Sequence, residues 1–347
     1  MRRSILILLT LSAALGAAPA LDTVPPKQVV NETLNYAHGK NAKGIAAYNA
    51  AQYEEALDQF AKAEESYALV DHQIGLIAVL QNKGLVYFAL HQDAKAMGFF
   101  EEAFTRSDLL SLPKGRADSC QKLGLIALDR GQFAEAKKRF TEAMGLYEKL
   151  KDDENIAASM NALGLTLLRE ENPALLDEAE KRFLDAAKIN RGKKQWKGVS
   201  VNEANLSEVA FRRKAYPAAL DHALSALHVE KQVEDSKGIG STLGRLAVIY
   251  EAMGEKDRAF LARQRAYEAN LALGLRDRQQ TDLRELLRLG ALTGRKARLE
   301  EYGKSLEAVS NELNRQRNRE ERERAKDEKD GKGADATPVH GSPRVGG

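Results

Sequence analysis

The sequence predicts an all-α protein, a solenoid of about six to seven antiparallel helix pairs. Small and aromatic residues recur with a period of about 40 residues, which is the first observation in favour. The second is a composition of 43% hydrophobic and 30% charged residues, which suits helices with one buried and one solvated face. The third is a low aromatic content of 6% without alternating β-branched segments, which argues against sheet.

The first element in the chain is a predicted secretory signal peptide over residues 1–20. Two arginines precede an apolar run from Ile5 to Leu15, and Ala18-Pro19-Ala20 matches a small-x-small cleavage site. The run is too short for an ordinary membrane-spanning helix. We therefore expect cleavage after Ala20, a linker over 21–30 and export to a periplasm, with secretion as the alternative. A retained amino-terminal anchor also stays open.

The repeat itself is the pattern Ala-x-x-x-aromatic-x-x-Ala. The step from Ala136 to Ala179 is longer than the other steps between first alanines, because "ENPALLD" contains three extra residues. The last two copies keep the alanine and lose the aromatic residue. The copies begin at Ala56 with Phe60, Ala96 with Phe100, Ala136 with Phe140, Ala179 with Phe183, Ala219 and Ala259.

A small residue precedes each of these alanines at a constant spacing, which is longer only in the copy with the insertion. Each repeat is therefore predicted to have two helices, of which the first carries the small residue and the second carries the alanine pattern. Small side chains on one helix face let two helices approach closely, and the aromatic ring fills the space beside them. The small residues are Gly44, Gly84, Gly124, Gly164, Ser207 and Ala247.

This pattern resembles the tetratricopeptide repeat in a variant of about 40 residues. Gly84, Tyr87, Ala96, Phe100 and Ala103 carry the resemblance, together with their counterparts in the other copies. The family's tryptophan near the start of the first helix and its proline after the second are missing. The resemblance implies a right-handed superhelix without enzymatic activity, whose first helices line a concave binding surface. The expected repeats are 31–70, 71–110, 111–150, 151–193, 194–233 and 234–273, followed by a capping pair over 276–313.

Acidic residues at the joints between repeats are predicted to cap the helices that follow: Asp71, Asp152 or Asp153, and Asp235. After residue 313 the composition changes to a charged tail, 314–347, with almost no large apolar residues. Acidic–basic pairs favour continuation of the last helix into the first part of this tail. The Gly/Pro/Ser-rich end is expected to be disordered.

No constellation of catalytic residues emerges from the sequence. Gly303-Lys304-Ser305 lacks the glycine and the strand of a phosphate-binding loop, and Ser111-Leu112-Pro113-Lys114 lacks the companion motifs of a penicillin-recognising enzyme. The six histidines show no metal-ligand spacing. Cys120, the only cysteine, is interpreted as a small buried residue. We expect no enzyme activity, cofactor or metal.

A column of amide residues marks the candidate binding groove. Amides can donate and accept hydrogen bonds at once, which suits the backbone of an extended peptide. Polarity at a helix–helix contact is the alternative explanation, and it stays open. Lys122, Arg169 and Arg245 are candidates to meet carboxylates. The predicted groove residues are Asn41, Gln81, Asn82, Gln121, Lys122, Asn161, Asn205 and Arg245.

The formal net charge of +3 implies no nucleic-acid partner. The sequence therefore predicts an exported, non-enzymatic scaffold that binds a protein or peptide partner in its groove. Two other functions stay open, an architectural subunit of an envelope or surface complex and an accessory protein that binds a small ligand. The identity of the partner and the oligomeric state are not determined by these patterns.

Overall fold

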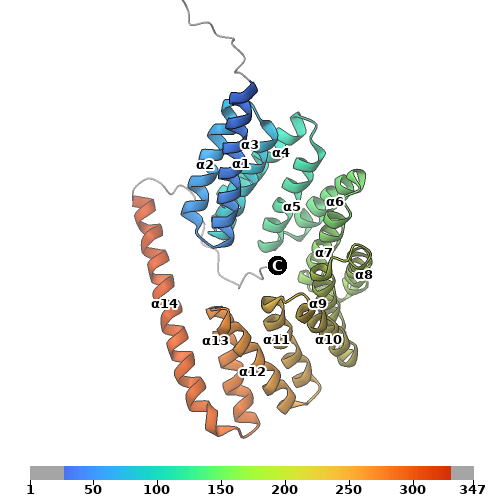
Figure 1. Cartoon of the computed structure of the whole chain (residues 1–347). Helices are drawn as coiled ribbons and strands as arrows, with labels where there is room; N and C mark the ends of the chain where they lie inside the picture. The colour runs from blue at the N-terminus through green and yellow to red at the C-terminus, as the bar shows by residue number, and fades with distance from the viewer. Residues whose placement is uncertain (1–26, 330–347) are drawn as a thin grey trace, which may run out of the picture. The chain divides into compact units, whose positions relative to one another are not determined.

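The computed structural model describes residues 27–329, and every regular element in that range is helical. The chain forms two compact units, residues 1–86 and 87–347, called unit 1 and unit 2 below. The predicted all-α solenoid of antiparallel helix pairs is confirmed (Figure 1). The predicted signal peptide, the far end of the tail and His340 lie outside the described residues. Within the described range no helix is long and apolar enough to cross a membrane.

Unit 1 contains α1 (Lys27–Asn49), α2 (Tyr53–Leu69) and most of α3 (Gln73–Ala89), which runs through the boundary. Unit 2 continues with alternating first and second helices of successive repeats. These are α4 (Asp93–Leu109), α5 (Pro113–Asp129), α6 (Phe133–Leu150), α7 (Asp153–Arg169), α8 (Leu176–Gly192), α9 (Trp196–Arg212), α10 (Tyr216–Gln232), α11 (Ser236–Ala252), α12 (Lys256–Ala272), α13 (Arg276–Leu292) and α14 (Leu299–Lys329).

Nearly every joint between helices is a three-residue turn of one kind. All thirteen residues with positive φ in the described range lie in these turns, one between each pair of consecutive helices. At the end of α3, for example, His91 has φ 59° and donates to Phe88 O, while Gln92 donates to Tyr87 O. This Schellman arrangement satisfies carbonyls that the helix end leaves free. Because the same turn follows the first and the second helix of a repeat, one helix with its turn makes up half of the repeat.

The three extra residues of the fourth repeat lie between α7 and α8. Six residues separate these helices, and Pro173–Leu175 among them form a 3-10 turn. The side chain of Asn172 accepts a hydrogen bond from Ala174 N at 3.1 Å and begins this turn. The insertion is thus absorbed at one joint, so the helices on either side keep their 17-residue length.

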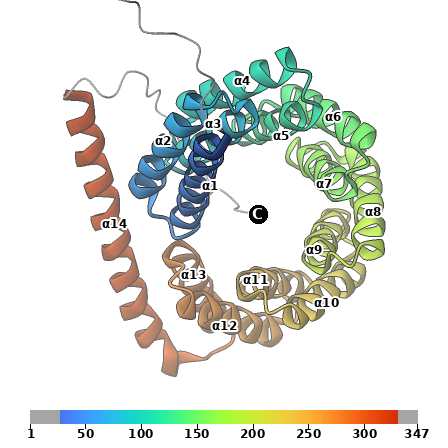
Figure 2. The same ribbon diagram turned by 45° about the horizontal axis from the view of Figure 1, so that its top comes forward.

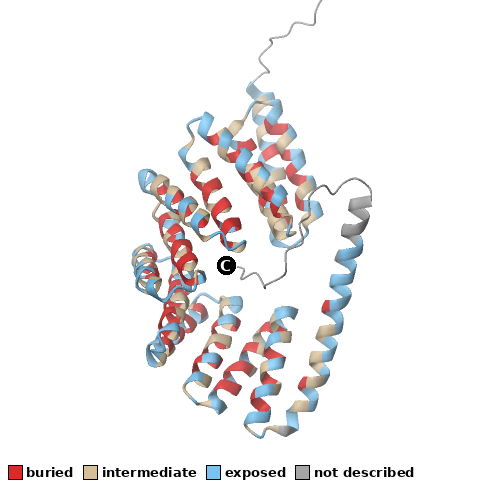
Figure 3. Ribbon diagram, turned by 180° about the vertical axis from the view of Figure 1, so that it is seen from behind, coloured by how far each residue is buried: buried red, intermediate tan, exposed pale blue. Residues whose placement is uncertain are grey.

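Glycine and phenylalanine pack against each other in three of the helix pairs, as the sequence predicts. A Cβ placed on Gly124 would lie 2.7 Å from Phe140 Cε1, and one on Gly164 would lie 2.6 Å from Phe183 Cε1. In unit 1 a Cβ placed on Gly44 would lie 2.5 Å from Phe60 Cε1. The alanines of the repeated pattern are fully buried beside these rings. Figure 3 shows such buried positions along the helices of each unit.

Later repeats replace the glycine–phenylalanine contact with polar ones. Ser207 Oγ donates to Ala219 O at 2.7 Å, which joins α9 to α10. In the next repeat Arg263 takes the aromatic position and donates to Asp282 Oδ1 at 2.9 Å and to Gly244 O at 3.2 Å. A buried ion pair therefore fills the space that a ring fills elsewhere.

Two of the three predicted helix caps are confirmed. Asp152 accepts from Asn155 N at 3.2 Å, and Asp235 accepts from Gly238 N at 3.0 Å. The prediction for Asp71 is wrong, because this residue occupies the left-handed turn position with φ 51°. The imidazole of His72 takes the capping role instead and accepts from Gly75 N at 3.0 Å.

Candidate interaction surface

The predicted groove residues all lie on first helices of the repeats. Asn41 is on α1, and Gln81 and Asn82 are on α3, in unit 1. In unit 2, Figure 2 shows α7, α9 and α11 on the inner side of the array and α6, α8 and α10 outside them. The unit 2 residues are Gln121 and Lys122 on α5, Asn161 on α7, Asn205 on α9 and Arg245 on α11. All of these residues are half-buried.

In unit 1 two of the predicted amides bind each other. Asn82 Nδ2 donates to Asn41 Oδ1 at 2.9 Å, which links α3 to α1 across one repeat. This bond occupies one acceptor and one donor hydrogen of the pair. Asn41 and Asn82 therefore contribute to the contact between first helices, as the packing interpretation expects.

In unit 2 a chain of amides leads from the interior to the surface. Asn190 Nδ2 donates to Asn202 Oδ1 at 2.8 Å, and Asn202 Nδ2 donates to Asn161 Oδ1 at 3.1 Å. Asn205 Nδ2 also donates to Asn161 Oδ1, at 2.8 Å. Asn190 and Asn202 are buried, whereas Asn161 and Asn205 are half-buried. The network thus fixes the orientation of two amides that face solvent.

This orientation leaves one donor and one acceptor for a ligand. Asn161 Oδ1 already accepts two hydrogen bonds, so the Nδ2 group of Asn161 is the part left to donate. Asn205 uses its Nδ2 group on Asn161, so Oδ1 of Asn205 is the part left to accept. Neither atom has a partner among the described residues. A donor beside an acceptor is the pattern that pairs with one peptide unit of an extended chain.

A second polar group lies on α5 and α6. Tyr147 Oη lies 2.6 Å from Asp118 Oδ1 and 3.1 Å from Gln121 Oε1, and its single proton can be donated to one of them at a time. Burial raises the pKa of Tyr147, and Asp118 acts in the same direction. The hydroxyl is therefore protonated at neutral pH and holds Gln121 and Asp118 in place on the first helix.

Lys122 is a half-buried cation of this surface without an ion pair. Burial lowers the pKa of Lys122, and the nearby Asp118 acts in the opposite direction. Within the described residues Lys122 forms no hydrogen bond or ion pair. A half-buried ammonium without a partner is costly, and an arriving carboxylate would relieve that cost.

Arg245 differs, because the chain supplies its anion. Arg245 Nη1 donates to Glu208 Oε2, and Arg212 Nε donates to Glu208 Oε1 at 2.7 Å. Burial acts to raise the pKa of Glu208, but the two arginines outweigh it and hold that pKa below its usual value. Arg245 therefore stabilises the contact between α9 and α11, whereas the sequence suggested a cation available to a ligand.

Sequence reasoning missed three residues that position this surface, namely the buried Asn190 and Tyr147 and the half-buried Asp118. A signal for them exists in the sequence. Buried polar pairs 12 residues apart recur at successive joints, as Asn190 with Asn202, Glu230 with Thr242, and Asn270 with Asp282. A polar residue that recurs with the repeat period at an otherwise apolar position indicates an internal hydrogen bond.

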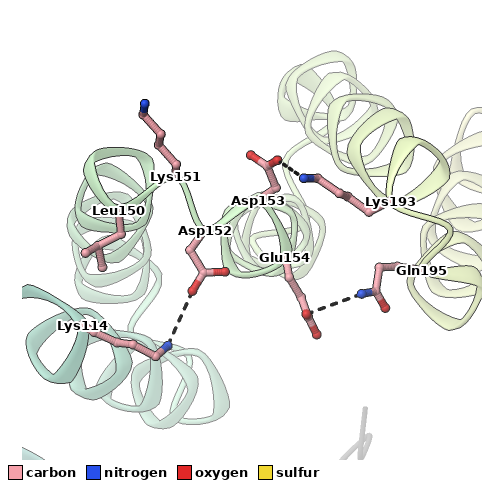
Figure 4. Close-up of a pocket in the computed structure, with 8 residues that line it drawn as sticks. All are labelled: Lys114, Leu150, Lys151, Asp152, Asp153, Glu154, Lys193 and Gln195. Atoms are coloured by element: carbon pink, nitrogen blue, oxygen red, sulfur yellow. Dashed lines mark hydrogen bonds and ion pairs between the residues drawn. The ribbon is translucent and has the colours of Figure 1, made fainter.

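A hollow of about 540 Å³ lies where three joints of unit 2 meet (Figure 4). Its charged residues are largely paired with one another. Lys114 lies 3.5 Å from Asp152, Lys193 lies 2.8 Å from Asp153, and Gln195 donates to Glu154 at 3.5 Å. Lys151 points away from the hollow in Figure 4. Leu150 completes the lining.

No metal-binding cluster occurs among the described residues. They hold no cluster of three or more His, Cys, Asp or Glu side chains that would bind a metal ion. Cys120 is buried, as the sequence predicts, and burial raises the pKa of its thiol to about 12. The thiol is therefore a poor nucleophile at neutral pH. Hydrogen bonding and ion pairing are the chemistry that this surface offers.

No family model matches the sequence. Among curated proteins, the photosystem I assembly protein Ycf3 of Prochlorococcus marinus (strain NATL1A) is 33% identical over 94 residues. This alignment covers 27% of the present chain and 49% of Ycf3, so the chain spans about half the length of that relative.

Two solved structures share the arrangement of helices. A signal transduction ATPase with a tetratricopeptide repeat sensor, from Pyrococcus horikoshii, superposes with a TM-score of 0.63 at 16% identity, over 82% of this chain and 45% of that one. The Rap conjugation gene regulator of plasmid pLS20, in complex with the Phr* peptide, gives a TM-score of 0.53 at 16% identity, over 84% and 98%. At these identities the likeness is one of fold, and the helix pairs of this chain are tetratricopeptide-like.

Proposed function

We propose that the protein is a non-enzymatic scaffold that binds an extended segment of a partner protein or a peptide along the first helices of its repeats. The observation that carries the proposal is the pair formed by Asn161 and Asn205. Buried amides orient these side chains so that a donor and an acceptor remain for a ligand. The peptide complex of the Rap regulator and the assembly role in the name of Ycf3 agree with such a function for this fold.

The same surface favours a ligand with an acidic group. Lys122 is half-buried and has no ion pair, whereas Arg245 is neutralised by Glu208. A carboxylate placed near Lys122 would gain a charge-assisted hydrogen bond, which is stronger than a hydrogen bond between neutral groups. We therefore expect the bound segment to carry Asp, Glu or a free carboxyl end at this point.

Selection from a random displayed peptide library tests both parts of this proposal. The wild-type protein should enrich peptides with an acidic residue at a fixed position. Asn161→Asp keeps an oxygen for Asn202 and Asn205 but replaces the outward donor with an acceptor, so enrichment should be lost. Lys122→Gln should retain binding and lose the preference for an acid.

Gln264→Glu provides the matched control, because Gln264 is a half-buried amide on the second helix α12, away from the first-helix surface. This variant should enrich the same peptides as the wild type. Circular dichroism of each variant should show an unchanged helical melting curve. Enrichment of the same peptides by Asn161→Asp would show that the first-helix amides do not bind the ligand.

We propose in addition that the protein is exported and that residues 1–20 are removed on the way. The basic start, the short apolar run and Ala18-Pro19-Ala20 support this. Cell fractionation followed by amino-terminal sequencing should find the chain in the periplasm, beginning at Leu21. A cytosolic chain that begins at Met1 would contradict the proposal.

A further inference from the structure

The exposed large apolar side chains that lie at turns of unit 2 gather at one class of turn. Helices of alternating direction place all turns between repeats at one edge of the unit, called the inter-repeat edge, and all turns within repeats at the opposite edge. Among the described residues, Leu292 is the one exposed large apolar residue at the opposite edge. The inter-repeat edge carries at least one at each of its five joints: Leu109, Leu150, Trp196, Val233 and Leu273.

The joint between α8 and α9 adds a concentration of positive charge. Residues 188–197, "KINRGKKQWK", contain five basic residues and no acidic one. Arg191 pairs with Glu203 and Lys193 with Asp153. Lys188, Lys194 and Lys197 are exposed, and their ammonium groups make no hydrogen bond or ion pair among the described residues. Trp196, the only tryptophan of the chain, is 46% exposed between them.

This arrangement suits a lipid surface better than a protein partner. The core of a protein interface needs a contiguous apolar patch that excludes water. Here single apolar side chains are separated by the spacing of the repeats and flanked by charges. Tryptophan prefers the boundary between hydrocarbon and headgroups, and lysine places its methylene groups in apolar surroundings while its ammonium stays in water. Clusters of lysine beside a membrane attract anionic lipids.

We propose that the inter-repeat edge of unit 2 docks peripherally on an anionic membrane surface, with Trp196 inserted among the headgroups and Lys188, Lys194 and Lys197 bound to lipid phosphates. Leu150, which lies beside the hollow of Figure 4, and Val233 extend the contact on either side of Trp196. This function is independent of peptide binding, because the first-helix amides do not take part in it.

Because Trp196 is the only tryptophan, its fluorescence reports on this joint alone. The full chain is titrated with vesicles of equal parts phosphatidylglycerol and phosphatidylcholine, and separately with pure phosphatidylcholine. We expect a blue shift of the Trp196 emission and quenching by brominated lipid on the anionic vesicles only, both reversed by salt. Unchanged emission on anionic vesicles would overturn the proposal. An equal shift on neutral vesicles would also overturn it, because the contact would then not depend on the charge of the lipid.

Charge-neutralising variants identify the lysines responsible. Lys194→Gln with Lys197→Gln should weaken partitioning onto anionic vesicles roughly 25-fold, since each lysine near such a surface contributes about a factor of five. Lys214→Gln with Lys256→Gln is the matched control at the opposite edge, and Lys214 occupies the same left-handed turn position as Lys194. If both pairs of substitutions weakened partitioning onto anionic vesicles equally, the inter-repeat edge would not be the docking surface. A blue shift of the Trp196 emission that grows with protein concentration in the absence of lipid would show instead that this edge binds a second copy of the chain.

Discussion

One buried position recurs in three successive repeats of unit 2, where it holds Asn190, Glu230 and Asn270. The side-chain amide of Asn190 donates to Asn202, and that of Asn270 donates to Asp282. In these two repeats the buried residue is therefore a neutral amide with a hydrogen-bond partner. Glu230 instead accepts from Thr242 Oγ1 at 2.9 Å through one oxygen, while its other oxygen is buried without a partner. A carboxylate in this position is therefore poorly solvated, which makes it the most pH-sensitive residue of the joint.

Stability should depend on the ionisation of Glu230. Burial raises the pKa of Glu230 from 4.5 to about 7, so the folded state binds this proton more tightly than the unfolded state does. Stability is therefore full below pH 4.5 and falls as the pH rises towards 7. Glu230→Gln should remove the loss and add about 3 kcal/mol at pH 8, with little gain near pH 4. Urea unfolding of both proteins across this range provides the measurement.

Glu234→Gln is the control, because Glu234 is exposed in the next turn. It should leave the pH profile of unfolding unchanged. A gain for Glu230→Gln that is the same at pH 4 and pH 8 would show that the carboxyl group of Glu230 does not titrate with folding. The other titratable group close to it is Asp235, whose charge acts to raise the pKa of Glu230 further.

At the scale of elements, helix and turn form one unit that occurs twice in each repeat. Nine of the thirteen left-handed turn positions hold a residue other than glycine. Each of these residues carries a conformational cost that glycine avoids. The protein tolerates the cost because the Schellman hydrogen bonds and the packing of both helices hold the turn in place.

Two glycines of α6 and its preceding turn should respond to alanine in opposite ways. Gly131 has φ 70° and open space around its Cα, so Gly131→Ala should cost about 1 kcal/mol through backbone strain alone. Gly145 has equally open space inside α6, so Gly145→Ala should stabilise by about 0.5–1 kcal/mol. Thermal unfolding should therefore shift down for the first variant and up for the second. Shifts of the same sign would contradict the left-handed turn.

At the scale of the molecule, an array of repeats must cover the apolar face of its last pair. In unit 2 this cover is α14, whose Tyr302 belongs to a buried cluster with Phe260, Leu283, Leu286 and Leu289. Leu313 of the same helix is also buried. The first residues beyond Leu313, from 314 to 319, are exposed, although the helix continues to Lys329. The sequence predicts that the solenoid ends at 313 and that the last helix continues into the charged tail, and α14 does extend beyond this point.

Truncation should separate these two parts of α14. A chain that ends at Arg298 should expose the cluster around Leu286, unfold at a lower temperature and aggregate, because a terminal repeat needs a polar outer face. A chain that ends at Arg317 keeps Tyr302 and Leu313 and should melt like the full protein. Differential scanning calorimetry with light scattering measures both effects. A stable, monodisperse chain ending at Arg298 would show that α14 is no cap.

The sequence by itself determined the repeat, its two helices and the residues at their contact. Local periodicity contains this information, because a glycine opposite a phenylalanine in successive repeats has few packing solutions, as Gly124 and Phe140 show. The tertiary structure decided which polar residues bind one another. Asn161 meets Asn205 across 44 residues, and Arg245 is neutralised by Glu208 across 37. Such pairings depend on which helices become neighbours, and therefore the surface left for a partner appears only in three dimensions.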